Sequence, residues 1–172
     1  ILGVNPANWI ETSKKIRDGY YIFLKWMVEI SKLNPHLNIE YKHHETFKGD
    51  KIEEKIFFKS NIKKSIYGDK NLSSYDYLLN STIAFSYCST MVLEAQALKK
   101  FAFFVDPENV ATTFFSHLPN LKKLRINNFS ELKKIVKRII YKKDLTYKFE
   151  SSDKICLNSK NVTKNLLNYL KN

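Results

Sequence analysis

The chain has very few cysteines: only two, Cys88 and Cys156, stand among its 172 residues. Their positions give neither a disulfide framework nor the paired spacing of a zinc site, so the sequence predicts no metal. So little cysteine is typical of a reducing compartment, and we therefore expect a cytoplasmic protein. Internal repeats and low-complexity segments are absent too, which favours an ordinary globular domain.

Long apolar runs are also lacking, since no uninterrupted stretch approaches the roughly 20 residues that span a membrane. The first residues, Ile1 to Val4, include no methionine and no basic segment followed by an apolar core. They are therefore not a secretory signal peptide. We expect instead that the sequence is a piece of a longer protein.

Acidic residues are outnumbered: 29 lysines and arginines against 17 aspartates and glutamates give a formal net charge of +12. This excess favours an anionic partner such as a nucleotide, an anionic lipid or a nucleic acid, although a lysine-rich source would also produce it. Neither a zinc pair nor an aromatic RNA-binding signature appears, so we do not expect nucleic acid. Hydrophobic residues make up 44% of the chain, enough for the core of one domain.

The most informative stretch runs from Ser81 to Pro107. Residues 82–85 form a short apolar run that is typical of a buried parallel strand, and residues 101–105 form a second one. Between them, residues 91–99 have the apolar spacing of a helix. The stretch therefore predicts a strand–helix–strand crossover within a Rossmann-like α/β domain, in which helices cover both faces of a parallel sheet.

Small polar residues fill the turn between the first of these strands and the helix. Ser86, Ser89 and Thr90 supply hydroxyl groups, and Ser89 or Thr90 can cap the helix. Because the first backbone N–H groups of a helix have no partner within it, we expect phosphate to bind here, with Glu94 placed to take a sugar hydroxyl. The alternative is an ordinary cap with a solvated Glu94.

Cys88 lies in the same turn, and the start of a helix can lower the pKa of a thiol. The plainer interpretation is that cysteine is a small residue that fits this position.

Two adjacent histidines follow another predicted strand, residues 37–41. His43 and His44 come directly after Lys42, at the end of a parallel strand where such sheets bind ligands. Imidazoles in this position can contact phosphate oxygens. The alternative is an exposed basic loop, and a zinc site is disfavoured because adjacent histidines point apart.

Gly68 lies in a later loop, where a nucleobase can approach the backbone closely because glycine has no side chain. The alternative for this loop is an ordinary turn.

The remaining elements are predicted from the same patterns. The predicted helices span residues 11–33, 51–58, 75–79, 131–141 and 155–170. A further strand is predicted over residues 61–66, and residues 121–126 are predicted to hold a short strand. Ser130 is the expected cap of the helix over residues 131–141, whose polar side is crowded with lysines. Such a helix can lie on anionic lipid, or it can simply be an outer helix with a solvated face. Residues 151–172 form a C-terminal helical tail to a single domain.

The order of these motifs resembles the C-terminal, donor-binding half of GT-B glycosyltransferases of bacterial surface polysaccharide synthesis. Related enzymes are the Kdo- and polysialic-acid-type transferases of lipopolysaccharide and capsule, and the glycerophosphotransferases of teichoic acid. Three segments carry the resemblance: Lys-His-His-Glu at 42–45, Ser-Ser-Tyr-Asp-Tyr-Leu-Leu at 73–79, and Ser-Tyr-Cys-Ser-Thr-Met-Val-Leu-Glu-Ala at 86–95. The family has proline after its histidine, where this chain has Glu45.

The resemblance implies roles for particular residues. His44 matches the histidine that contacts the donor phosphate and is the candidate catalytic residue. Ser89 and Thr90 match the phosphate-binding pair, and Glu94 matches the acidic residue that holds the ribose. No residue matches the catalytic base, which such enzymes supply from their N-terminal half.

The resemblance therefore implies an enzyme whose isolated donor-binding half is inactive. Its expected partners are a CMP-, CDP- or UDP-linked sugar, a missing N-terminal acceptor-binding domain and the inner face of an anionic membrane, and no cofactor is expected. Two alternatives stay open. One is a glycerophosphotransferase or sugar-nucleotide epimerase half-domain, and the other is a non-enzymatic basic module that binds lipid or nucleic acid.

Overall fold

A computed structural model describes residues 14–42, 52–58, 60–64, 74–109, 112, 115–116 and 121–142. The first half contains α2 (Lys14–Leu33), β1 (Ile39–Tyr41), α3 (Ile52–Phe57), β2 (Ile62–Lys64) and α4 (Ser74–Asn80). The second half contains β3 (Ile83–Ser86), α5 (Met91–Ala97), β4 (Phe101–Val105), α6 (Leu121–Leu124), β5 (Arg125–Ile126), α7 (Phe129–Val136) and the π-helical turn η3 (Lys137–Tyr141). The regular alternation of helix and strand confirms the predicted α/β class.

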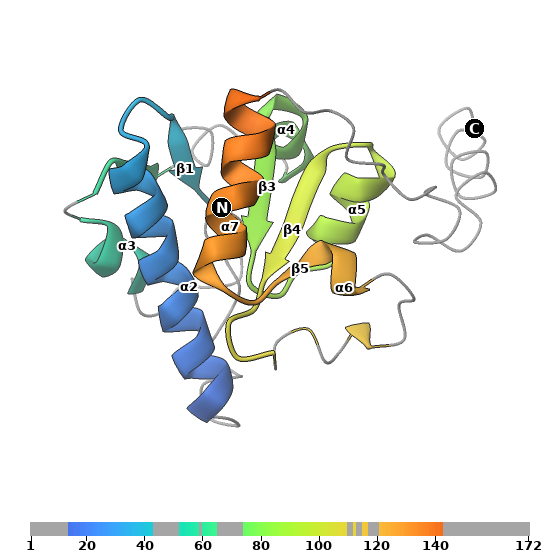
Figure 1. The fold of residues 1–172 in the computed structure, drawn as a ribbon, viewed down its shortest axis with the longest axis horizontal. Coiled ribbons are helices and arrows are strands. Elements are labelled where there is room, and N and C mark those ends of the chain that lie inside the picture. The colour runs from blue at the N-terminus through green and yellow to red at the C-terminus, as the bar shows by residue number, and fades with distance from the viewer. Residues whose placement is uncertain are drawn as a thin grey trace, which may run out of the picture.

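The strands form two small parallel sheets. β1 pairs with β2, and β3 pairs with β4, which in turn pairs with β5. Every one of these pairs is parallel, as a Rossmann-like half-domain requires. β3 is the outer strand of its hydrogen-bonded sheet, and β1 lies on that side of it (Figure 1).

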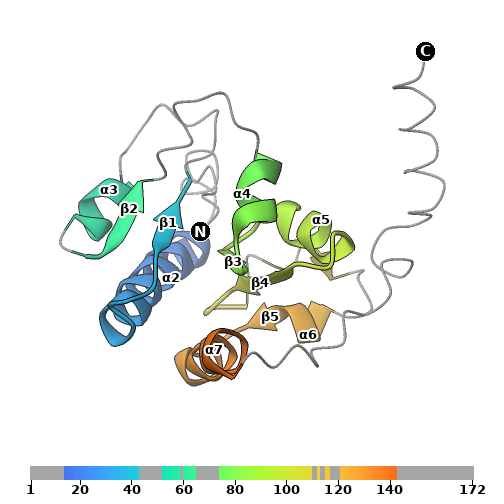
Figure 2. The same cartoon turned by 90° about the horizontal axis from the view of Figure 1, so that it is seen from above.

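Helices cover both faces of the three-stranded sheet. Seen from above, α4 and α5 lie on one side and α2 and α7 on the other (Figure 2). β4 is the central strand, and all five of its side chains are buried. Its alternate residues belong to two cores: Phe103 and Val105 join α2 and α7, while Ala102 and Phe104 join α4, α5 and α6. A strand buried on both faces explains the uninterrupted apolar run in the sequence.

The long helix α2 supplies much of the first core. Its buried residues recur every three or four positions and include Tyr20, Phe23, Met27 and Ile30. The helix ends where the sequence predicts, and the Asn34 side chain donates a hydrogen bond of 2.7 Å to the Ile30 carbonyl. That bond satisfies one of the carbonyl groups that a helix end leaves without a partner.

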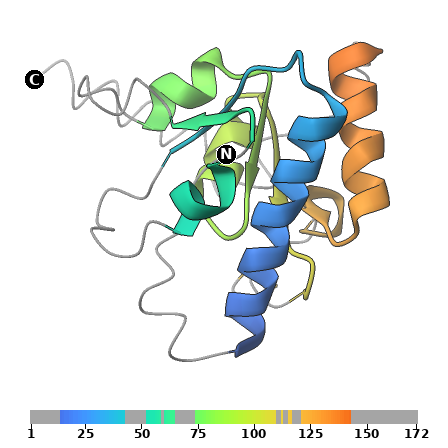
Figure 3. The ribbon, with the colours of Figure 1, turned by 90° about the vertical axis from the view of Figure 1, so that its left-hand side faces the viewer.

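The short helix α3 fixes β1 and β2 against α2 (Figure 3). The Tyr20 hydroxyl donates a hydrogen bond of 2.5 Å to the buried carboxylate of Glu53. The rings of Tyr41 and Phe57 lie 5.1 Å apart, which joins β1 to the same helix. Burial, together with Glu54 and Glu53, raises the pKa of Tyr41 to about 12, so this phenol stays neutral.

The start of α7 corrects one prediction. Asn128, and not Ser130, caps this helix: its side chain accepts a hydrogen bond of 2.8 Å from the Glu131 N–H. Asn128 has the extended backbone of a cap residue, whereas Ser130 already lies inside the helix. The predicted helix over residues 131–141 is also not uniform, because its last five residues form η3.

Most shorter elements agree with the sequence patterns. The helices predicted over 51–58 and 75–79 correspond to α3 and α4, and the strand predicted over 61–66 corresponds to β2. In residues 121–126, only Arg125–Ile126 is strand, since the preceding four residues form α6. The predicted last helix at 155–170 and the tail at 151–172 lie outside the described residues. Among the helices that the structure describes, none has the length and apolar character needed to cross a membrane.

Candidate functional site

The turn after β3 is more deeply buried than its polar sequence suggests. Ser86 has no exposed surface, and Tyr87 and Cys88 are 1% and 7% exposed. Ser89 is half-buried and Thr90 is exposed. Of the three hydroxyl residues proposed to contact a ligand, therefore, only Ser89 and Thr90 reach the surface.

The first N–H groups of α5 already have partners in this structure. The Met91 N–H donates to the Ser89 hydroxyl at 3.3 Å, and the Val92 N–H donates to the Ser89 carbonyl at 3.1 Å. Thr90 occupies the cap position with a helical backbone, and its hydroxyl makes no capping hydrogen bond. A phosphate at this turn would therefore be bound mainly by hydroxyl groups, because the helix N–H groups are engaged.

Glu94 is held by a neighbouring helix. Its carboxylate accepts a short hydrogen bond from the Tyr75 hydroxyl. This bond, together with partial burial and the Glu94 charge, raises the pKa of Tyr75 above its ordinary value. Tyr75 lies in the first turn of α4 and Glu94 in the first turn of α5. The contact therefore brings the starts of two helices together and fixes the direction of the Glu94 side chain.

The end of β1 reaches the same region. Lys42 follows β1, and its Nζ atom lies 5.2 Å from the centre of the Tyr77 ring in α4, a cation–π contact. Because α4 also carries Tyr75, the carboxyl end of β1 and the starts of α4 and α5 lie close together. In the sequence His43 and His44 come next, but these two residues and Gly68 lie outside the described residues.

A cavity of about 750 Å³ separates β1 from β3. It runs along both strands, since Leu37 to Lys42 line one side and Ser81 to Phe85 the other, together with Asp76 and Tyr77 of α4. Ser89, Thr90 and Glu94 do not line it and lie beyond the carboxyl end of β3. β2 pairs with β1 on the side away from β3, and β4 pairs with β3 on the side away from β1 (Figure 2). In open α/β sheets, ligands bind at such a reversal of strand order, outside the carboxyl ends of the strands.

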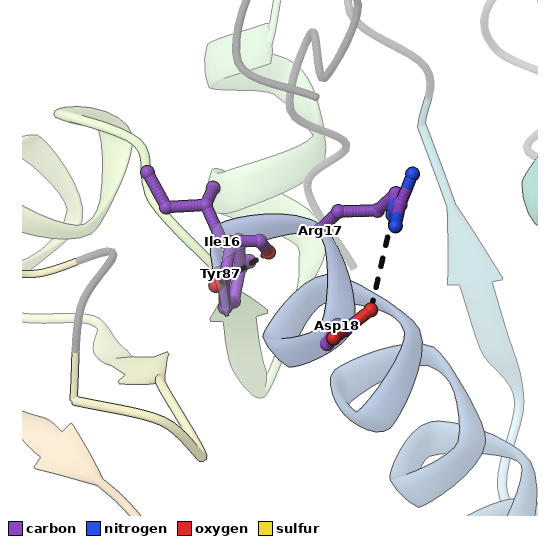
Figure 4. A network of polar contacts seen from close by, with 4 residues as sticks. All are labelled: Ile16, Arg17, Asp18 and Tyr87. Carbon is purple, nitrogen blue, oxygen red and sulfur yellow. Dashed lines mark hydrogen bonds and ion pairs between the residues drawn. The ribbon is translucent and has the colours of Figure 1, made fainter. Parts of the chain in front are cut away.

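Tyr87 connects this region to α2. Its hydroxyl donates a hydrogen bond of 2.8 Å to the Ile16 carbonyl, near the exposed ion pair of Arg17 and Asp18 (Figure 4). Its ring also packs 5.5 Å from that of Tyr20. Burial, followed by Asp106, Cys88 and Glu108, raises the pKa of Tyr87. Tyr87 therefore positions the turn and is too buried to bind a ligand.

Cys88 does not have the lowered pKa that a helix start can produce. Burial, followed by the charge of the nearby Asp106, raises its pKa to about 12. The thiol is thus neutral at physiological pH and a poor nucleophile. Cys88 therefore agrees with its interpretation as a small residue packed in the core.

Asp106 is a buried polar residue to which the sequence patterns assigned no role. It follows β4 and has no exposed surface. Its carboxylate accepts hydrogen bonds from the Thr112 N–H at 2.9 Å and from the Thr112 hydroxyl at 2.7 Å. In the sequence, this contact is indicated only by an aspartate at the end of an apolar run and a threonine six residues later. Asp106 therefore closes the loop after β4 beside the candidate site.

No metal centre is formed by the side chains that the structure describes, since none of their His, Cys, Asp and Glu residues gather in groups of three or more suited to hold an ion. Comparisons with protein-family models, with curated proteins and with solved structures found no match to this chain.

Proposed function

We propose that this domain binds the nucleotide-sugar donor of a GT-B-type glycosyltransferase in bacterial surface polysaccharide synthesis. The observation that carries the proposal is the junction of β1 and β3. β1 and β3, which pair with their next strands on opposite sides, flank a cavity there, and Ser89, Thr90 and Glu94 follow the carboxyl end of β3. This is where open parallel sheets bind nucleotides.

Each surface residue of the site has a defined part in donor binding. The hydroxyls of Ser89 and Thr90 donate to a phosphate, with His44 expected beside them from its place after β1. Glu94, oriented by Tyr75, accepts a hydrogen bond from a ribose hydroxyl. Donors aimed at the phosphate stabilise the negative charge that develops on the leaving nucleotide.

The arrangement supports donor binding and not a whole catalytic cycle. The proposed acceptor site and catalytic base belong to another domain, as the resemblance implies. The buried Cys88 thiol, which is neutral at physiological pH, does not serve as a nucleophile. The function proposed for the domain itself is therefore to hold and polarise the donor.

Isothermal titration calorimetry with CMP, CDP, UDP and GDP tests this proposal. We expect one of them to bind, and Ser89→Ala with Thr90→Val to weaken binding by about 1–3 kcal/mol, or roughly fivefold to a hundredfold. Circular dichroism must show the variant folded, because Ser89 also caps α5. Unchanged affinity in the folded variant would contradict the phosphate assignment.

A matched control comes from the opposite end of the same strand. Thr82 and Thr90 are both exposed and flank β3 at its amino and carboxyl ends. Thr90→Val should weaken nucleotide binding, whereas Thr82→Val should leave it nearly unchanged. If Thr82→Val had the larger effect, the ligand would lie in the cavity between β1 and β3, which Thr82 lines.

The main alternative within the same fold is a glycerophosphotransferase or a sugar-nucleotide epimerase half-domain. Both would use the same phosphate site, so binding experiments cannot separate them. Analysis of the products formed by the full-length protein distinguishes the three reactions, because glycosyl transfer forms a glycosidic bond, glycerophosphotransfer forms a phosphodiester, and epimerisation inverts a stereocentre of the sugar.

A further inference from the structure

A second surface feature lies between α2 and α7, which run side by side (Figure 3). A cavity of about 360 Å³ opens there, here called the α2–α7 groove. The groove is lined by Ile30, Leu33, Asn34, Lys133, Val136, Lys137 and Tyr141. Ser89, Thr90 and Glu94 of the proposed donor site do not line this groove, although Ile30 and Val136 also line the β1–β3 cavity.

The groove exposes apolar surface. Leu33, the last residue of α2, is 58% exposed, and Tyr141, the last residue of η3, is 48% exposed. Tyr141 is held in place, since its hydroxyl donates a hydrogen bond of 2.5 Å to Asn34 and lies 3.0 Å from the His36 ring nitrogen. The groove therefore presents a leucine and an oriented tyrosine to the surroundings.

Basic side chains border this apolar surface. Lys133 and Lys137, one helical turn apart, line the groove and are exposed. Further exposed basic residues of the same two helices and the following turn are Lys25, Lys32, Lys134, Arg138 and Lys142. Within α2, α7 and η3 the acidic residues are Asp18, near the start of α2, Glu29, which is paired with Lys32 at 2.8 Å, and Glu131, which is half-buried in the first turn of α7.

We propose that the α2–α7 groove docks on an anionic lipid surface, with Leu33 and Tyr141 entering the interface and the lysines contacting headgroup phosphates. The charge favours any polyanion, but the exposed leucine and the apolar floor of Ile30 and Val136 match lipid and offer nothing to a nucleic acid backbone. This inference does not rest on the proposed donor site, because Leu33, Tyr141, Lys133 and Lys137 do not line the β1–β3 cavity, whereas the buried Ile30 and Val136 line both hollows.

Vesicle sedimentation with the full 172-residue chain tests the lipid assignment. We expect binding to phosphatidylcholine vesicles that contain roughly a quarter phosphatidylglycerol, and little binding to pure phosphatidylcholine. Binding should weaken steeply as salt is raised, because salt screens the attraction between lysines and headgroups. Equal binding to both vesicles would overturn the proposal.

Matched variants locate the contact. Lys133→Gln with Lys137→Gln should weaken binding by roughly tenfold or more, since each basic residue near the surface contributes about 1 kcal/mol. Lys55→Gln with Lys122→Gln removes the same charge from exposed positions on α3 and α6 and should change binding less than about threefold. Equal losses in the two variants would show a general charge effect and no groove.

Leu33→Ser separates apolar insertion from charge, since it leaves every charge in place. It should weaken vesicle binding roughly threefold to tenfold, in line with the transfer energy of a leucine that is partly buried at an interface. An unchanged affinity, or an oligonucleotide that binds more tightly than the vesicles at the same salt concentration, would overturn the lipid assignment. Thermal unfolding of each variant confirms that it is folded.

Discussion

Gly19 lies where α2 packs tightly against Tyr87 in the turn after β3. A Cβ atom on Gly19 would lie 2.5 Å from the Tyr87 hydroxyl and 3.2 Å from its ring. Alanine normally improves a helix by about 1 kcal/mol over glycine, but here the clash should dominate. We expect Gly19→Ala to lower the free energy of unfolding by about 1–3 kcal/mol, measured by urea denaturation.

The Tyr87→Phe background serves as the control, because it removes the oxygen that the new methyl group would meet. Tyr87→Phe alone should cost about 1 kcal/mol through the lost hydrogen bond to Ile16. In that background, Gly19→Ala should be much less destabilising. An equal cost in both backgrounds would show that the Tyr87 hydroxyl is not the source of the strain.

Cys88 should make the stability of the protein depend on alkaline pH. Its pKa rises from an ordinary value of 9.0 to about 12 on folding, so the folded state retains the proton longer than the unfolded state. The contribution is complete below about pH 9 and is lost as the pH rises toward 12. Tyr41 and Tyr87 act in the same direction. Compared with wild type, Cys88→Ala should therefore show a shallower loss of unfolding free energy over this range.

The reactivity of the Cys88 thiol gives a second readout of the same burial. At pH 8 we expect its reaction with a disulfide reagent to be slow in the folded protein and fast in denaturant. The Cys156→Ser background makes Cys88 the sole thiol in the chain. A rapid reaction in the folded state would contradict the buried, neutral thiol.

At the scale of the element, α5 is followed by a residue with an unusual backbone conformation. Lys99 has a positive φ of 56°, the left-handed conformation that glycine normally occupies after a helix. The Lys99 N–H donates to the Gln96 carbonyl, and the Lys100 N–H donates to the Ala95 carbonyl, each at 2.9 Å. Lys99→Gly should raise the unfolding free energy by about 1 kcal/mol, because it removes the Cβ strain and keeps both bonds. Lys99→Val should lower it, and a gain for valine would contradict the assigned backbone.

The start of α7 offers a comparison between two neighbouring polar residues. Asn128→Ala removes the side chain that accepts the Glu131 N–H and should cost about 1 kcal/mol. Ser130→Ala, two residues later inside the helix, should change stability by less than about 0.5 kcal/mol. Chemical denaturation of both variants decides between the two caps, since the reverse order of costs would support Ser130.

At the scale of the whole molecule, the domain should bind its donor without transferring the sugar. A half-cleft leaves much of a nucleotide sugar in water, so we expect a Kd near about 1 mM for the best nucleotide. Transfer should be undetectable with this chain alone, because the acceptor site and base are expected elsewhere. Incubation with candidate sugar nucleotides and acceptors is the test. Turnover that His44→Ala abolished would show a complete enzyme and contradict the half-domain proposal.

The sequence by itself determined the elements whose patterns are local. The apolar run of β4 could only be buried on both faces, and the three- and four-residue spacing in α2 places Phe23 and Met27 in the core. The helix predicted over residues 11–33 ends at Leu33, because Pro35 follows and the residue before a proline avoids the helical conformation. Parallel pairing followed from the alternation of helices and strands.

Only the tertiary structure decided which polar residues reach the surface and what they contact. Ser86 and Cys88 have the same polar, turn-like surroundings in the sequence as Thr90, yet both are buried. Between them, Tyr87 bonds to Ile16 of α2, a partner 71 residues away in the sequence. The Tyr75–Glu94 bond likewise joins two helices that no local pattern relates. Burial and such long-range contacts depend on how elements pack, and hydrophobic periodicity records only which side of an element faces the core.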